Sequence, residues 1–379
     1  MMAPSRRTRI LIVDDSAAMR SFLRSVIVSD PSLEIAGTAA DGASALGLLD
    51  LSGPDLILLD VEMPVMNGLE TLKQLQRRGR KVPVIMCSSL TRGGASVTIE
   101  ALASGASDYV TKPAGHSCRE QALTALAQDL LPKIHALTGT EEPRPATIAS
   151  RGRDLASLPP QARTIGPTPA AVPAVVAIGV STGGPAALDV LLPELPASFS
   201  LPVLIVQHMP EVFTGLFAQR LNQRCPLTVR EACEGDQVRP GNIFIARGGW
   251  HMEVVAPSNP RVPATIHLNQ DLPENHCRPA VDVLFRSVAK VYGADVLGVV
   301  LTGMGSDGLA GSRAICTQGG SILAQDKPTS TVWGMPGAVT EAGLARKTLP
   351  LAAIAPEIIR AASRTAATSE APARAGMAV

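Results

Sequence analysis

The chain has 379 residues, of which 34 are Lys or Arg and 33 are Asp or Glu, so its formal net charge is only +1. This balance gives no electrostatic reason to expect binding to nucleic acid or to an anionic membrane surface. Hydrophobic residues make up 46% and aromatic residues only 3%, which predicts aliphatic cores and disfavours a base-stacking surface. The length predicts two or three domains.

The cysteines and the N-terminal segment indicate the compartment. The 6 cysteines include no C-x-x-C pair, which disfavours a disulfide framework or a zinc knuckle and favours a reducing cytoplasm. Before the first two acidic residues the chain has only a short apolar run, at 10–13, which is not a signal peptide. It contains no stretch of about 20 apolar residues. We therefore expect a cytoplasmic protein that does not insert into a membrane.

Residues 1–125 are predicted to form a first α/β domain. Apolar runs at 9–13, 55–60 and 83–89 predict buried strands. Between the first two runs, apolar residues recur at helical spacing over 19–27, which predicts an amphipathic helix. Strands that alternate with helices predict a doubly wound parallel sheet covered on both faces.

Residues 126–170 are rich in Pro, Ala, Ser, Thr and Arg and lack periodicity, which predicts a flexible linker. A helix that begins near Glu120 is expected to run slightly into this segment and to end at Pro132, because proline lacks the backbone N–H and clashes with the preceding turn.

A second α/β domain is predicted over residues 171–365, followed by a disordered tail at 366–379. Its strand-like apolar runs lie at 174–180, 202–207, 241–246 and 294–303. Each predicted domain has equal numbers of acidic and basic residues, so neither provides a basic surface for nucleic acid.

Polar residues gather at the predicted strand ends of the first domain. Asp14 and Asp15 follow the first strand, and Asp60 ends the second. Ser88 and Lys112 stand at the ends of two further strands. Carboxylates that converge at one edge of a parallel sheet need a cation, and Mg²⁺ prefers oxygen ligands. The hydroxyl and the ammonium group would stabilise the oxygens of a phosphorylated aspartate.

Each of these residues also has a simpler interpretation. An isolated Asp at such a position is often a helix N-cap or lies in a solvated turn, and Lys112 alone would be a surface lysine. Five such residues at the ends of four predicted strands favour a shared site.

Residues 8–125 resemble the receiver domain of two-component response regulators in the segments VDDS (13–16), DVEMPVMNG (60–68), SS (88–89) and DYVTKP (108–113). The resemblance implies a flavodoxin-like fold in which Asp60 is the phosphoacceptor. It also implies that Asp15 ligates Mg²⁺ directly and Asp14 indirectly, and that the backbone oxygen of Glu62 is a third ligand.

The same resemblance assigns further roles. It implies that Ser88 and Lys112 contact the phosphoryl group and that Tyr109 is the aromatic switch. It also implies a cis peptide bond between Lys112 and Pro113, which proline tolerates.

The second domain contains a candidate serine nucleophile. Residues 179–183 match G-x-S-x-G directly after a predicted strand, which exposes Ser181 at a sharp turn before a helix. His208 follows the next strand and Asp307 follows a third. A serine hydroxyl needs a base, and an acid can orient that base. These residues predict a serine catalytic triad.

Several alternatives remain at this stage. Ser181 and Asp307 are also typical helix caps. Three further histidines lie in the domain, namely His251, His267 and His276, and His276 is the best rival base. Residues 303–308 match the dinucleotide motif G-x-G-x-x-G, but the motif comes late in its domain and leaves the serine, histidine and acid unexplained.

Residues 173–350 resemble the protein-glutamate methylesterase/glutaminase of bacterial chemotaxis, the CheB family, in IGVSTGGP (178–185), VQHMP (206–210), NHCRPAVDVLF (275–285) and LTGMGSDG (301–308). The order Ser, His, Asp differs from that of ordinary α/β-hydrolases. The resemblance implies a Rossmann-like parallel sheet with Ser181 as nucleophile, His208 as base and Asp307 as orienting acid. It places the Met304 backbone N–H in the oxyanion hole. The turn geometry suggests the Thr182 N–H as a second donor.

The combined resemblance implies a phosphorylation-activated hydrolase. It would demethylate glutamate methyl esters on methyl-accepting chemotaxis receptors, release methanol, and deamidate receptor glutamines. A chemotaxis histidine kinase would be the phosphodonor, and Mg²⁺ would serve only the receiver, with no cofactor for the esterase. The alternative is a receptor-docking adaptor without catalysis, which has no use for the predicted triad. A DNA-binding regulator is disfavoured by the charge balance and by the lack of a helix-turn-helix signal.

Overall fold

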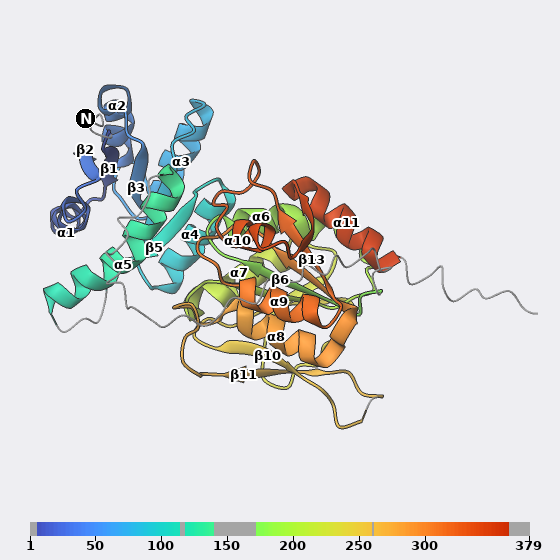
Figure 1. Ribbon diagram of the computed structural model, residues 1–379. Coiled ribbons are helices and arrows are strands. Elements are labelled where there is room, and N and C mark those ends of the chain that lie inside the picture. The colour runs from blue at the N-terminus through green and yellow to red at the C-terminus, as the bar shows by residue number, and fades with distance from the viewer. Residues whose placement is uncertain (1–5, 114–117, 140–171, 260, 364–379) are drawn as a thin grey trace, which may run out of the picture.

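The computed structural model describes residues 6–113, 118–139, 172–259 and 261–363, and these form two parallel sheets with their covering helices (Figure 1). Residues 140–170 of the predicted linker and the predicted tail at 366–379 lie outside the described ranges. Within those ranges, the helices are too short or too polar to cross a membrane.

The first sheet has the strand order β2-β1-β3-β4-β5, with all neighbours parallel. This is the strand order of a flavodoxin-like fold, which the resemblance to receiver domains implied. Its elements are β1 (Thr8–Val13), α1 (Ala17–Val28), β2 (Leu33–Ala39), α2 (Gly42–Ser52), β3 (Leu56–Asp60), α3 (Gly68–Arg77), β4 (Val84–Ser88), α4 (Arg92–Ala103), β5 (Asp108–Thr111) and α5 (Arg119–Thr138).

Helices cover both faces of this sheet. Helix α1 packs against α5, while α3 packs against α2 and α4. Every residue of the central strand β3 is buried, as expected for an apolar run in a parallel sheet.

Helix α5 differs from its prediction, because it continues through Pro132 to Thr138. Leu130 and Ile134 on either side of the proline are fully buried, and this burial outweighs the hydrogen bond that proline cannot donate. The implied cis bond before Pro113 is also wrong, since the cis peptide bond found in the described residues precedes Pro279.

The second sheet has the order β14-β13-β12-β6-β7-β9-β8 and is also parallel throughout. Its elements are β6 (Val175–Val180), α6 (Gly184–Leu191), β7 (Val203–Gln207), α7 (Glu211–Asn222), β8 (Thr228–Glu231), β9 (Asn242–Ile245), α8 (Val281–Tyr292), β12 (Val296–Val300), α9 (Leu309–Thr317), β13 (Ser321–Gln325), α10 (Met335–Glu341), β14 (Ala345–Leu349) and α11 (Leu351–Ser363). An antiparallel pair, β10 (His251–Val255) and β11 (Thr265–Asn269), packs through β10 against α8.

The strand order of the second sheet positions its polar loops. Strand β6 lies between β12 and β7. The chain segments that leave these three parallel strands therefore meet at one edge of the sheet, where α/β proteins usually bind ligands.

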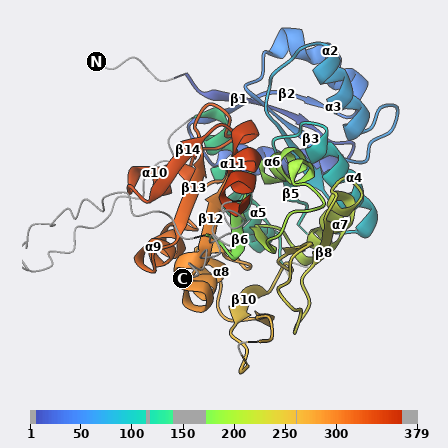
Figure 2. The same ribbon diagram turned by 90° about the vertical axis from the view of Figure 1, so that its right-hand side faces the viewer.

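The two domains pack directly against each other. Helix α4 of the first domain contacts α6 and α7 of the second, and Figure 2 shows these helices side by side. One hydrophobic cluster contains residues from both domains, including Ile99 and Phe213.

Candidate functional site

The acidic cluster forms where β1 and β3 end. Side-chain oxygens of Asp14, Asp15 and Asp60 all lie within 4.8 Å of one another. Lys112 follows β5, and its Nζ lies 2.8 Å from a carboxylate oxygen of Asp14 and 2.8 Å from one of Asp60. Oxygen ligands with this much negative charge fit Mg²⁺, so the donor set agrees with the predicted metal site.

The electrostatics of Asp60 follow from its burial. Burial raises the pKa of this carboxyl to about 6, and the neighbouring charge of Asp14 adds to the effect, although Lys112 and the backbone N–H of Glu62 oppose it. Asp60 therefore lies in a site that favours an added cation.

The other predicted phosphate-site residues lie nearby on the same sheet edge. Ser88 ends β4, and its hydroxyl accepts a hydrogen bond from Thr98 Oγ1 (2.7 Å) and donates one to the Ser89 carbonyl oxygen (3.1 Å). Glu62 lies two residues beyond Asp60 with an exposed side chain. Tyr109 is different, because its buried ring points to the second domain and stacks on Phe213 of α7 at 4.6 Å between centroids.

The loop after Asp60 is fixed by the start of α3. Asn67 Oδ1 accepts from the Glu70 backbone N–H (2.9 Å), while a Glu70 carboxylate oxygen accepts from the Asn67 N–H (3.0 Å). This reciprocal capping box satisfies two backbone donors and sets where the helix begins.

The second site lies in a cleft of about 1140 Å³ between the domains. Ser181 follows β6 and His208 follows β7, while Asp307 lies in the loop between β12 and α9. All three line this cleft. The strand order therefore brings the three predicted residues together.

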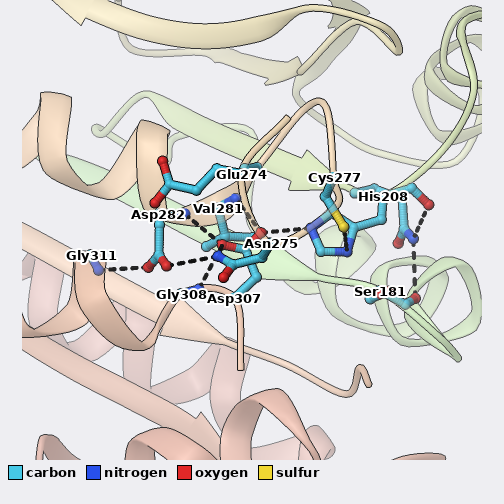
Figure 3. Close-up of polar contacts among 12 residues, drawn as sticks. Ser181, His208, Glu274, Asn275, Cys277, Val281, Asp282, Asp307, Gly308 and Gly311 are labelled. Atoms are coloured by element: carbon cyan, nitrogen blue, oxygen red, sulfur yellow. Dashed lines mark hydrogen bonds and ion pairs between the residues drawn. The ribbon is translucent and has the colours of Figure 1, made fainter. Parts of the chain in front are cut away.

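His208 and Asp307 form a direct pair. His208 Nε2 lies 2.8 Å from Asp307 Oδ2, and Figure 3 shows the imidazole between this carboxylate and Cys277. Burial alone would lower the pKa of His208, but the hydrogen bonds to Asp307 and Cys277 outweigh it and raise the pKa to about 9. Burial alone would raise the pKa of Asp307, but His208 and two backbone N–H groups hold it below its usual value.

The serine and the histidine are near each other but not bonded. In the described part of the chain, the Ser181 hydroxyl makes no hydrogen bond with His208. His208 Nδ1 lies instead 3.5 Å from Cys277 Sγ. Catalytic hydrogen bonds are often long before substrate binds, so this arrangement is compatible with a serine and base that still have to approach.

The rival histidines occupy other places. His251 is buried with both ring nitrogens engaged, by the Leu272 carbonyl (3.1 Å) and the Ala280 N–H (3.2 Å). His267 is exposed and pairs with Glu234. His276 lines the cleft, but the described contacts of Asp307 include His208 and not His276.

The predicted oxyanion donors are available. In the described ranges, the backbone N–H groups of Thr182 and Met304 have no acceptor within the protein. Both residues line the cleft beside Ser181. Two free N–H groups next to a nucleophile are what an oxyanion hole requires.

Gly303 allows the β12 loop to approach the serine. A Cβ added at Gly303 would lie 2.8 Å from Ser181 Cβ and would also meet Met335. The G-x-G-x-x-G match at 303–308 thus has a packing role against Ser181, and its Asp307 is paired with His208.

Three neighbours of the site were not assigned a role from sequence. Cys277 touches His208, and Asn275 donates to Asp307 (2.9 Å). Asp108 of the first domain accepts a 2.6 Å hydrogen bond from the Thr182 hydroxyl, with both residues buried. Burial raises the pKa of this Asp108 carboxyl. The motif at 275–285 contained the signal for the first two, but residue spacing does not show where a loop side chain points.

The fold and the two sites define a response-regulator receiver joined to an α/β hydrolase. The response regulator receiver family matches residues 10–128, and the CheB methylesterase family matches residues 176–358. A Trichodesmium erythraeum protein named protein-glutamate methylesterase/protein-glutamine glutaminase is 46% identical over 352 residues, which is 93% of this chain and 98% of that protein. A Nocardioides protein of the same name is 44% identical, covering 94% of this chain and 96% of that protein.

The chain therefore belongs to the protein-glutamate methylesterase/protein-glutamine glutaminase family. Among solved structures, the Thermotoga maritima CheB methylesterase catalytic domain is 40% identical with a TM-score of 0.48, covering 50% of this chain and 98% of that one. The response regulator domain of Thermotoga maritima CheB is 42% identical with a TM-score of 0.32, covering 36% of this chain and 100% of that one.

Proposed function

We propose that this chain is a phosphorylation-activated serine hydrolase that removes methyl groups from glutamate methyl esters of chemotaxis receptors and deamidates receptor glutamines. The observation that carries the proposal is the meeting of Ser181, His208 and Asp307 in one cleft, with His208 and Asp307 2.8 Å apart. Such an enzyme would act in sensory adaptation in the cytoplasm.

The geometry supports a two-step acyl transfer. Neutral His208 takes the Ser181 proton as the serine oxygen attacks the ester carbonyl, and the Thr182 and Met304 N–H groups bind the resulting oxyanion. The protonated histidine then gives its proton to the leaving methoxide, so methanol departs and an acyl-enzyme remains. Water, deprotonated by His208, hydrolyses that acyl-enzyme to a glutamate carboxylate. With a glutamine substrate the same steps release ammonia.

The catalytic proposal is tested with Ser181→Ala. The variant is expected to lose at least about 10⁴-fold in methanol release from methylated receptors, because the nucleophile is gone. Phosphorylation of Asp60 and the melting temperature should stay close to those of the parent chain. Methanol release at the parent rate would instead favour the docking-adaptor alternative.

The receiver domain implies Mg²⁺ binding by its acidic cluster. We propose Asp14, Asp15, Asp60 and the Glu62 backbone oxygen as the residues that would hold it. The bound cation would neutralise the charge of an incoming phosphoryl group. Lys112, already 2.8 Å from Asp60, would contact the phosphoryl oxygens together with Ser88, and a chemotaxis histidine kinase would be the phosphodonor.

Phosphorylation would act by uncovering the cleft. Residues of β5 and α5 line the cleft that contains Ser181. The Asp108 to Thr182 hydrogen bond and the Tyr109 to Phe213 stack join the domains beside it. Phosphorylated Asp60 would shift the population away from this covered arrangement, with Tyr109 as the aromatic switch.

A further inference from the structure

The Asp307 carboxylate is surrounded by donors. Its Oδ2 accepts from the Val281 N–H (2.6 Å) and faces His208 Nε2 (2.8 Å), while its Oδ1 accepts from Asn275 Nδ2 (2.9 Å), the Asp282 N–H (2.9 Å) and the Gly308 N–H (3.0 Å). Two of these N–H groups belong to the first turn of α8, whose N-cap residue Ala280 makes no side-chain cap. Asp307 therefore caps α8 from a distant part of the chain.

A second carboxylate lies behind the first. Asp282 is 3% exposed, and its Oδ1 accepts from the Gly311 N–H at 2.6 Å. Its Oδ2 accepts from Asn275 Nδ2 at 3.0 Å. The Asn275 amide thus donates one hydrogen to each carboxylate, as Figure 3 shows.

The backbone of Asn275 is suited to this placement. Its φ is +53°, in the left-handed region that Asn adopts more readily than most residues. The conformation directs a side chain from a cleft-lining loop toward α8 and the Asp307 loop, so the residue type matches both the turn and the bridge.

We propose that Asn275 and Asp282 are positioning residues, which fix the Asp307 carboxylate in the orientation that holds His208. The inference rests on the proposed function, since it assigns His208 and Asp307 as base and orienting acid. Two neighbouring carboxylates repel each other, and an amide that donates to both keeps them apart in one geometry. Asp282, held by Gly311, anchors the amide from the side opposite Asp307.

The orientation of Asp307 matters because it determines which ring nitrogen of His208 faces Ser181. Asp307 sets the orientation and tautomer of His208, and a misoriented base lowers turnover more than substrate binding. Asn275 and Asp282 act through Asp307, so their effect should fall on kcat.

The first test variant is Asn275→Gly in the full chain, with the same phosphodonor throughout. Glycine adopts the left-handed φ freely, so the change removes the amide without backbone strain. We expect kcat for methanol release to fall about 10-fold with KM within twofold. The matched control is Asn222→Ala, which removes a different amide, one that accepts from the Val229 N–H at 2.8 Å, and should keep the parent kcat.

The second readout is the pH dependence of kcat. Its acid limb is the part of the profile in which kcat falls as the pH decreases and His208 becomes protonated. Among the described residues, the titratable groups next to His208 are Asp307 and Cys277, with Asp282 and Glu274 one step further out. Lys133 of α5, which interacts with Cys277, and His276 also line the cleft. Asp282→Asn removes a negative charge and replaces one of the two acceptor oxygens by an N–H donor. The loss of charge should move the limb to lower pH. Asn275→Gly removes a donor from Asp307, whose charge then acts more strongly on His208, so the limb should move to higher pH. A purely structural role would not shift the limb in opposite directions.

The outcomes separate the two levels of inference. A parent chain that releases no methanol, or a Ser181→Ala variant as fast as the parent, overturns the proposed function itself. With the parent active and Ser181→Ala inactive, the positioning roles are wrong if Asn275→Gly keeps kcat within twofold, or if both variants lose activity without moving the limb. Should Asn275→Gly fail to fold by melting temperature, Asp282→Asn alone decides through the direction of its shift.

Discussion

At the scale of single residues, His208 is governed by two neighbours of different chemistry. Asp307 holds Nε2 and Cys277 contacts Nδ1, and these two hydrogen bonds raise the pKa of the imidazole to about 9. A cationic imidazole cannot accept the Ser181 proton. In the arrangement with the receiver docked, His208 Nδ1 faces Cys277 Sγ, and the raised pKa of the imidazole favours its protonated form over the neutral base.

Cys277→Ala should therefore shift the pH dependence of the esterase. The base is active when neutral, so activity is present above the His208 pKa and lost as the pH falls through it. Removing the thiol removes one of the interactions that raise this pKa. The acid limb of kcat/KM, the fall in activity on the acidic side of the pH profile, should therefore move to lower pH.

The control for this variant is Cys225→Ala, which removes a half-buried thiol that lies near Asp189. Its pH profile should overlay that of the parent chain. An acid limb that stays in place or moves upward in Cys277→Ala would refute the role assigned to the thiol.

Some residues of the two candidate sites could be predicted from the sequence and others could not. Asp60, Ser181 and His208 could be predicted because each ends or directly follows a buried apolar run, and parallel strands bring such ends together. Asn275 and Cys277 lie on a loop without periodicity, whose path depends on long-range contacts such as the one between His251 and Leu272.

At the scale of elements, the close approach of the β12 loop to the β6 turn defines the nucleophile's surroundings. Gly303→Ala is expected to destabilise the fold by about 1–3 kcal/mol, because the added methyl group overpacks the contact with Ser181. Activity should fall as well, since the serine must move. Chemical denaturation and methanol release measure the two effects.

The matched control is Gly47→Ala in α2, where an added Cβ meets nothing within 4 Å. A helical alanine in place of glycine should stabilise by about 0.5–1 kcal/mol and leave activity unchanged. Equal stability changes in the two variants would show that the approach of Gly303 to Ser181 is not tight.

The strands that could be predicted from the sequence are those that are buried on both faces of their sheet. Strands β3, β6, β7 and β12 have all residues buried, and their apolar runs were recognised. Strand β14 at the edge of its sheet alternates between half-buried and exposed residues, so it offers no such run. Helix α5 continues beyond its predicted end at Pro132. The rule that proline ends a helix considers only the neighbouring residues and not the burial of this helix against the rest of the domain.

At the scale of the whole molecule, the domain contacts predict the basal activity. Deleting residues 1–140 should raise esterase activity above that of the unphosphorylated full chain, since the receiver lines the cleft. Asp108→Ala should have a smaller effect in the same direction, about 10-fold at most, because it removes one buried hydrogen bond to Thr182.

Methanol release by the unphosphorylated proteins measures both changes. The control is Glu100→Ala, which also removes an acidic side chain from the receiver domain. The ion-pair partner of Glu100 is Lys73 of the same domain, so this variant breaks no ion pair between the domains. A truncated protein no faster than the unphosphorylated full chain would rule out simple occlusion of the cleft.

Residues of both domains line the cleft, so binding in the cleft and docking of the receiver affect each other. Binding free energies are reciprocal. If phosphorylation uncovers the cleft as proposed, a molecule that fills the cleft and excludes the receiver must favour the phosphorylated form by the same factor by which phosphorylation favours its binding. The receptor segment would then be an effector as well as a substrate. A segment that occupies the cleft would therefore bias the receiver toward the undocked arrangement.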